Sequence, residues 1–126
     1  YTNFTNQCYI KSKIKELTMA KFYALGTYTE ESFQAFIKNP GQDRKAAVNA
    51  LSSAMGASFS DIEFLRGPYD FIATIEADSF ETVAAVKMAV EAQGVGTIDI
   101  FETVDINSIA EKAQKAMSNY SPPSED

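Results

Sequence analysis

The sequence has 126 residues, about the size of one domain, with 45% hydrophobic and 22% charged residues, as in ordinary globular proteins. It contains no histidine, which excludes Ser-His-Asp and Cys-His catalysis, His-ligated haem and His-containing zinc sites. Its one cysteine, Cys8, cannot form an internal disulfide. The formal net charge of -6, with scattered basic residues and no long apolar stretch, argues against nucleic-acid and membrane partners. We therefore expect a cytoplasmic protein.

The first 18 residues differ from the rest of the chain. They precede the first methionine, Met19, and carry a small positive charge, so we expect an N-terminal appendage at 1–18. The alternative is a genuine helix or arm, because Ile10, Ile14 and Leu17 have helical spacing.

The first half of the remaining sequence predicts a strand and two helices. Residues 21–28 form an apolar and aromatic run typical of a buried strand. Thr29 then caps a short helix, which Asn39-Pro40-Gly41 ends because proline and glycine interrupt helices. A second helix is predicted from Asp43, with Gly56 as its left-handed cap.

Residues 58–77 predict a β-hairpin that turns at Gly67-Pro68. Strict alternation over 58–66 would place Phe59 on one side of the first strand and Ile62 and Phe64 on the other. The second strand is predicted over 69–77, with Phe71, Ala73 and Ile75 on one side.

The last part of the sequence predicts a helix, a strand and another helix. Asp78, with Glu81 three residues later, is typical of a capping box, and the helix that it starts ends at Gly94. Residues 95–104 form the last strand, and Asp105 caps a C-terminal helix over 105–118. That helix is expected to turn these apolar residues inward: Ile106, Ile109, Ala113 and Met117. Residues 119–126 are expected to be a disordered tail.

This order is the split β-α-β-β-α-β pattern of a ferredoxin-like α+β fold, predicted over 19–104. It gives a four-stranded antiparallel sheet with helices on one face, so the other face must meet water, a ligand or a partner. The aromatic candidates for that face are Tyr23, Tyr28, Phe64 and Phe101. An apolar open face is usually covered in a homodimer, with two sheets facing each other across a shared cavity.

Three segments resemble the GYD domain family. They are the turn Gly67-Pro68-Tyr69-Asp70, the run Tyr-Ala-Leu-Gly-Thr-Tyr-Thr-Glu-Glu at 23–31, and Asn39-Pro40 followed by Arg-Lys-Ala-Ala at 44–47. The resemblance covers about residues 19–104. It implies a dimeric α/β-barrel architecture and no particular reaction. Related barrel families include cofactor-free oxygenases, lactone isomerases, haem-binding enzymes and ligand-binding regulatory domains, which are analogies of fold alone.

The pair Tyr69-Asp70 has two interpretations. In the structural one, Asp70 accepts backbone N–H bonds from the Gly67-Pro68 turn and Tyr69 packs at the end of the sheet. In the functional one, Asp70 accepts a proton beside a cavity and Tyr69 donates a hydrogen bond. Arg66 could hold a substrate carboxylate or pair with Asp70. The candidate ligand-binding residues are therefore Tyr23, Tyr28, Arg66, Tyr69 and Asp70.

Four carboxylates on the predicted strands could converge on Mg²⁺ or Ca²⁺, but no ligand loop of recognised spacing is present. They are Asp61, Glu63, Glu76 and Asp99. We interpret them as solvated strand residues and expect no metal and no cofactor.

The sequence favours a small, non-catalytic or weakly catalytic homo-oligomer that binds a partly apolar small molecule in a cavity on the open sheet face. One alternative is a cofactor-free oxygenase or isomerase that uses Tyr69 and Asp70 for proton transfer. The other is a pure assembly module whose sheet face is sealed by a partner.

Overall fold

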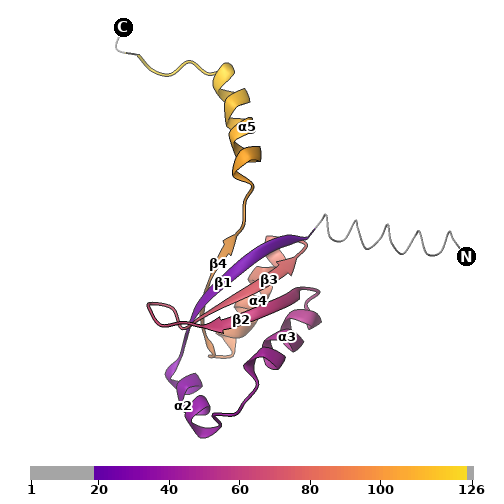
Figure 1. Cartoon of the computed structure of the whole chain (residues 1–126), viewed down its shortest axis with the longest axis vertical. Helices are drawn as coiled ribbons and strands as arrows, with labels where there is room; N and C mark the ends of the chain where they lie inside the picture. The colour runs from indigo at the N-terminus through magenta and orange to yellow at the C-terminus, as the bar shows by residue number, and fades with distance from the viewer. Residues whose placement is uncertain (1–18, 125–126) are drawn as a thin grey trace, which may run out of the picture.

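The computed structural model describes residues 19–124, and the predictions for residues 1–18 and for Cys8 lie outside this range. It is an α+β fold with one sheet and four helices (Figure 1). In chain order the elements are β1 (Ala20–Tyr28), α2 (Glu30–Lys38), α3 (Arg44–Ala54), β2 (Ser58–Phe64), β3 (Phe71–Ala77), α4 (Phe80–Ala92), β4 (Gly96–Glu102) and α5 (Ile106–Ser118).

The four strands form one antiparallel sheet in the order β2-β3-β1-β4. In the centre, Phe22 of β1 lies opposite Ile75 of β3, and Ala24 lies opposite Ile100 of β4. This order, with each crossover helical, confirms the predicted ferredoxin-like fold. The first crossover contains two helices, α2 and α3, because Pro40 and Gly41 separate them.

Side-chain caps explain where the helices begin. Thr29 accepts a hydrogen bond from the Ser32 amide at 3.2 Å, and Asp43 accepts one from the Ala46 amide at 3.0 Å. For α4 the predicted cap, Asp78, is wrong by one residue, because Ser79 has the extended backbone of an N-cap and accepts from the Thr82 amide.

The core lies on one face of the sheet. Phe22, Ala24 and Ile75 from the central strands are buried there against Val83 and Val86 of α4. Their neighbours in sequence alternate to the other face, which no helix of the described chain covers. In Figure 1 the viewer looks at this open face, with α4 behind the sheet.

The strict alternation predicted for 58–66 is wrong, because β2 contains a β-bulge. The register shifts between Phe59 and Asp61, so that Phe59, Ile62 and Phe64 lie opposite Ile75, Ala73 and Phe71, three helix-side residues. One extra residue in a strand moves every side chain beyond it to the opposite face of the sheet from the one that strict alternation predicts. Phe64 therefore lies on the helix side, as does Tyr28, so of the four aromatic candidates for the open face only Tyr23 and Phe101 lie there.

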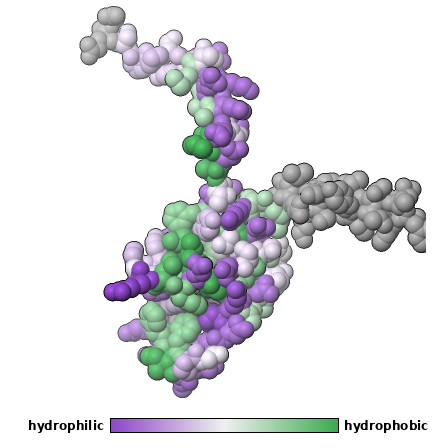
Figure 2. All heavy atoms as spheres, viewed as in Figure 1, coloured by the Kyte–Doolittle hydropathy of each residue, from purple (hydrophilic) through white to green (hydrophobic). Residues whose placement is uncertain are grey.

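The prediction that α5 turns its apolar residues inward is wrong. Asp105 caps the helix as expected, but every residue from 101 to 124 is exposed, Ile106 to 69% and Met117 to 73%. The helix extends away from the sheet, with apolar side chains on its surface (Figures 1 and 2). A short link after β4 leads away from the core, so α5 has nothing of the described chain to pack against. Within residues 19–124, no helix has the length and hydropathy needed to span a bilayer.

Candidate functional site

The open face of the sheet has an apolar centre. Tyr23 of β1 pairs with Phe101 of β4, and Leu25 of β1 pairs with Ile72 of β3. Tyr23, Leu25 and Ile72 are half-buried, whereas Phe101 is 51% exposed. Figure 2, which is viewed from this side, shows apolar groups among polar ones across the sheet. We call these four residues the open-face patch.

Tyr69 lies beside this patch. Its hydroxyl donates a hydrogen bond to Oδ2 of Asp99 at 2.9 Å. Asp99 lies opposite Leu25 in the register, so the hydrogen bond is on the open face. The nearby Asp99 carboxylate raises the pKa of the Tyr69 hydroxyl above its usual value of 10.0, because it stabilises the protonated donor.

The Asp70 carboxylate has a different partner from the Tyr69 hydroxyl. Its Oδ2 accepts a hydrogen bond from the backbone amide of Tyr28 at 2.8 Å, and its own amide donates to the Gly26 carbonyl at 2.8 Å. The structural interpretation of Asp70 named turn amides as its donors, whereas the structure shows the amide at the end of β1. The Tyr69 hydroxyl and the Asp70 carboxylate are thus held by different partners, Asp99 and the Tyr28 amide, and no hydrogen bond joins them.

A wide cavity lies on the helix side of the sheet. Its volume is about 650 Å³, within the range of small-molecule sites. We call it the helix-side pocket. Its lining includes six residues from α2, α3, the strands and the β2–β3 loop: Tyr28, Phe36, Arg44, Ile62, Phe64 and Asp70.

Aromatic rings form one wall of the helix-side pocket. The Tyr28 ring lies 5.0 Å from that of Phe36 and 6.1 Å from that of Phe33, both in edge-on geometry, and 4.9 Å from that of Phe71. Such pairs fix the orientation of the rings. The Tyr28 hydroxyl is thereby held where β1 meets α2 and α3.

Arg44, the first residue of α3, is the cation nearest to Tyr28. Its guanidinium carbon lies 5.9 Å from the centre of the Phe36 ring. Burial raises the pKa of the Tyr28 hydroxyl above 10.0, while the positive charge of the nearby Arg44 guanidinium partly offsets that effect. Tyr28 therefore keeps its proton at neutral pH, beside a permanent positive charge.

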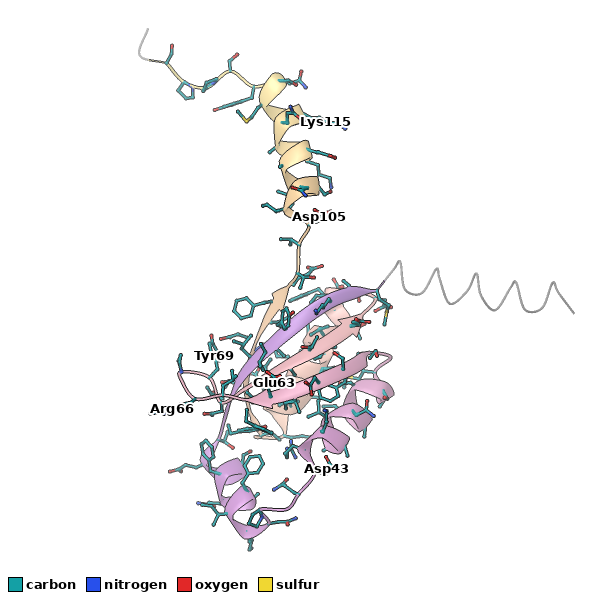
Figure 3. All side chains as sticks on the ribbon, in the orientation of Figure 1. Asp43, Glu63, Arg66, Tyr69, Asp105 and Lys115 are labelled. Carbon is teal, nitrogen blue, oxygen red and sulfur yellow. The ribbon has the colours of Figure 1, made fainter. Side chains whose placement is uncertain are left out.

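The predicted site residues thus divide into three groups. Tyr23 and Tyr69 lie on the open face, Tyr28 and Asp70 line the helix-side pocket, and Arg66 is exposed in the β2–β3 loop, which projects from the body (Figure 3). The structure brings together only Tyr28 and Asp70.

The four strand carboxylates do not form a cluster. Asp61 forms an ion pair with Lys45 of α3 at 2.8 Å, and Asp99 accepts from Tyr69. The Lys45 ammonium group lowers the pKa of the exposed Asp61 carboxyl. Over residues 19–124, no group of three or more His, Cys, Asp or Glu side chains is placed to hold a metal ion.

The sequence-based list of ligand residues did not include Arg44 and Phe36. Arg44 directly follows the N-cap Asp43, and Phe36 lies one turn before the Asn39-Pro40-Gly41 break. Two helices joined by a tight break place the end of the first beside the start of the second. That break is the sequence signal that could have placed these two residues together.

Two comparisons with known proteins bear on this arrangement. A family model described as the GYD domain matches residues 22–113, from β1 into α5. The chain is also 31% identical, over 77 residues, to a Thermus thermophilus protein described as glutamine synthetase and cystathionine beta-lyase binding protein. That alignment covers 60% of this chain and 79% of the relative.

Proposed function

Since the chain belongs to the GYD domain family, we propose that it is a binding protein that acts as a homo-oligomer, with the open sheet face of one copy packed on that of a second copy. The observation that carries the proposal is the open-face patch. All helices that pack on the sheet lie on its other side, which leaves Tyr23, Leu25, Ile72 and Phe101 without cover in the described chain.

The chemistry of this face fits a second copy of the chain. Its centre is apolar and aromatic, and charged residues such as Glu63, Glu76 and Asp99 lie around it, which is the pattern of a protein interface. A two-fold interface uses the same patch on both copies and needs no other surface. In such an assembly, the second copy also offers cover for the apolar residues of α5.

Light scattering coupled to size-exclusion chromatography tests this assembly. We expect the wild-type chain to have at least twice its monomer mass of 13.8 kDa at micromolar concentrations. Phe101→Glu places a charge in the patch and should shift the mass toward the monomer. The matched control is Met88→Glu on α4, which is 73% exposed and away from the open face, and it should keep the wild-type mass.

Two results would contradict the proposal. The first is a wild-type monomer at every concentration tested. The second is equal loss of mass in Phe101→Glu and Met88→Glu, which would show that any added charge disrupts the protein.

A protein partner of another kind is the second candidate. It is supported by the description of the Thermus relative as a binding protein of two enzymes, and by the exposed apolar residues of α5. In this second candidate, α5 contacts such an enzyme instead of the second copy. Biolayer interferometry checks this with glutamine synthetase and cystathionine beta-lyase purified from the organism that encodes this chain. Binding that Ile109→Glu abolishes supports the candidate, and the lack of binding to either enzyme rejects it.

The geometry gives less support to the enzymatic alternative. Proton transfer by the Tyr69-Asp70 pair needs both groups at one reacting atom, but the Tyr69 hydroxyl bonds Asp99 on the open face, whereas Asp70 bonds the Tyr28 amide and lines the helix-side pocket. The open face also has no walls of its own, so a small ligand there would need a second copy to enclose it. The helix-side pocket offers walls within one copy.

A further inference from the structure

Three cavities of the described chain meet at Tyr28 and Arg44. Both residues line the helix-side pocket of about 650 Å³, a smaller hollow of about 210 Å³ under α2, and an inner cavity of about 210 Å³. Apolar side chains line most of the inner cavity, among them Val48 and Leu51 of α3 and Val86 of α4. The pair therefore lies where the open helix-side pocket, which carries several charged groups, meets an apolar interior.

Arg44 has unused hydrogen-bonding capacity at this boundary. Its Nε is buried and has no hydrogen-bond partner among residues 19–124. The ion pairs found in the same residues involve Lys45 and Lys87, not Arg44. A buried guanidinium N–H without an acceptor is costly, so such a group usually meets one in the functional state.

The other charged groups around the pocket already have partners. Lys45 pairs with Asp61, Asp43 caps α3 through the Ala46 amide, and Asp70 accepts from the Tyr28 amide. Arg44 is thus the cation of the pocket that has no carboxylate partner within the described chain. A planar guanidinium is suited to two parallel hydrogen bonds with a carboxylate.

We propose that the helix-side pocket binds a small organic carboxylate with an apolar, preferably aromatic, body. The Arg44 guanidinium holds the carboxylate, and the Tyr28 hydroxyl donates a hydrogen bond to it. The apolar body lies along Phe36 and Phe64, and its far end reaches toward the inner cavity. This site lies within one copy and on the opposite side of the sheet from the open-face patch, so it does not depend on the proposed assembly.

The probes should separate charge from shape. Hydrocinnamate, phenylpropylamine and L-phenylalanine share a phenyl body but carry a carboxylate, an ammonium group or both. Each is titrated into the full-length chain, with amide chemical shifts as the readout. We expect hydrocinnamate to shift the amides of Tyr28, Asp70 and Arg44, and phenylpropylamine to leave them unchanged at the same concentration.

L-Phenylalanine distinguishes two kinds of carboxylate. Asp70 has one carboxylate oxygen that no described hydrogen bond uses, which could accept from an ammonium group. Tighter binding of L-phenylalanine than of hydrocinnamate identifies an amino acid as the ligand class, whereas weaker binding identifies a simple acid. Either result supports the carboxylate site.

Variants assign the contact to Arg44. Arg44→Gln should weaken hydrocinnamate binding by about tenfold or more, because a charge-assisted hydrogen bond is lost. Tyr28→Phe keeps the ring and should weaken binding severalfold. The matched control is Lys38→Gln on α2, which removes an exposed cation outside the helix-side pocket and should leave binding unchanged.

Three results would overturn the proposal. These are no shift with hydrocinnamate in a folded wild-type protein, equal shifts with phenylpropylamine, and unchanged binding by Arg44→Gln. A thermal unfolding curve for each variant shows that it is folded. Because the oligomer mass is measured separately, failure of this site leaves the assembly proposal standing, and the reverse also holds.

Discussion

The carboxylate of Asp70 accepts a hydrogen bond from the backbone amide of Tyr28 at 2.8 Å. These residues are 42 positions apart, and the bond joins the start of β3 to the end of β1. Tyr28 then leads directly into Thr29, the cap of α2. One side-chain contact therefore fixes the direction in which the chain leaves the sheet to form the helix-side pocket.

The first prediction concerns this contact. Asp70→Ala leaves the half-buried Tyr28 amide without an acceptor and should lower the free energy of unfolding by about 1–2 kcal/mol. Asp70→Asn keeps an oxygen that can accept the same hydrogen bond, so its loss should be smaller. Urea denaturation of the two variants measures the difference. Equal losses would show that the charge, and not the acceptor, is what the fold requires.

The second prediction concerns Ser52 of α3. Its side chain is fully buried, and its hydroxyl has no hydrogen-bond partner among the described residues. Burying a hydroxyl without a partner is unfavourable, so Ser52→Ala should raise the free energy of unfolding by about 1 kcal/mol. The neighbouring exposed Ser53→Ala is the control, because it measures the gain from helix propensity alone. An equal increase in the free energy of unfolding for both variants would show that burial of the Ser52 hydroxyl does not destabilise the protein.

The third prediction concerns the close approach of β1 and β4. A Cβ atom at Gly96 would overlap the Thr27 carbonyl oxygen and come within 3.3 Å of the Tyr28 Cα. Since backbone atoms cannot move aside as a flexible side chain can, Gly96→Ala should destabilise the protein by about 1–3 kcal/mol. At Gly41 the nearest atom, Asn39 Oδ1, would be 3.9 Å away, so Gly41→Ala should be close to neutral. Thermal unfolding of both variants provides the comparison.

The fourth prediction concerns alkaline pH. The pKa of the Tyr69 hydroxyl is raised above 10.0 in the folded protein by Asp99. The folded state therefore keeps a proton that the unfolded state releases as the pH passes 10.0. Stability from this contact is fully present below that pH and is lost as the pH rises through the raised pKa.

Tyr69→Phe provides the measurement for the fourth prediction. Its free energy of unfolding should fall less steeply than that of the wild type above pH 10.0. The free energy of unfolding of the variant should still decrease with pH, since burial also raises the pKa of Tyr28. An unchanged slope would contradict the assigned hydrogen bond.

The fifth prediction concerns α5. Since every residue of α5 is exposed, removing residues 105–126 should leave the urea midpoint of the isolated, dilute protein unchanged. The same truncation should reduce the mass measured by light scattering if α5 contacts the second copy. A large loss of stability in dilute solution would instead show that α5 packs on its own sheet.

Local patterns in the sequence predicted most of the elements. Thr29, Asp43 and Asp105 begin their helices as expected, because an N-cap depends on residues only three or four positions away. Gly56 and Gly94 have the positive φ values expected of helix ends, 77° and 72°. The open face and the family also followed from the order of elements and from three short segments.

Three features of the site depended on contacts between distant parts of the chain. Strict alternation failed in β2 because a bulge at Phe59 and Asp61 is set by pairing with β3, and so Phe64 turns to the helix side. The separation of Tyr69 from Asp70 is decided by Asp99 and by the Tyr28 amide, 30 and 42 residues away. Arg44 and Phe36 come together only when α2 and α3 fold back over the end of the sheet.

The sequence alone determined the periodicity and the capping, and therefore the elements, their order and the presence of one uncovered sheet face. These are short-range properties, since each residue's neighbours in sequence carry the information. Only the tertiary structure decided which side chains share a cavity, because side chains distant in sequence meet through strand register and helix docking. For this chain it places Tyr28 beside Arg44 at the helix-side pocket, apart from Tyr23 and Tyr69 on the open face, and it leaves α5 without cover among residues 19–124.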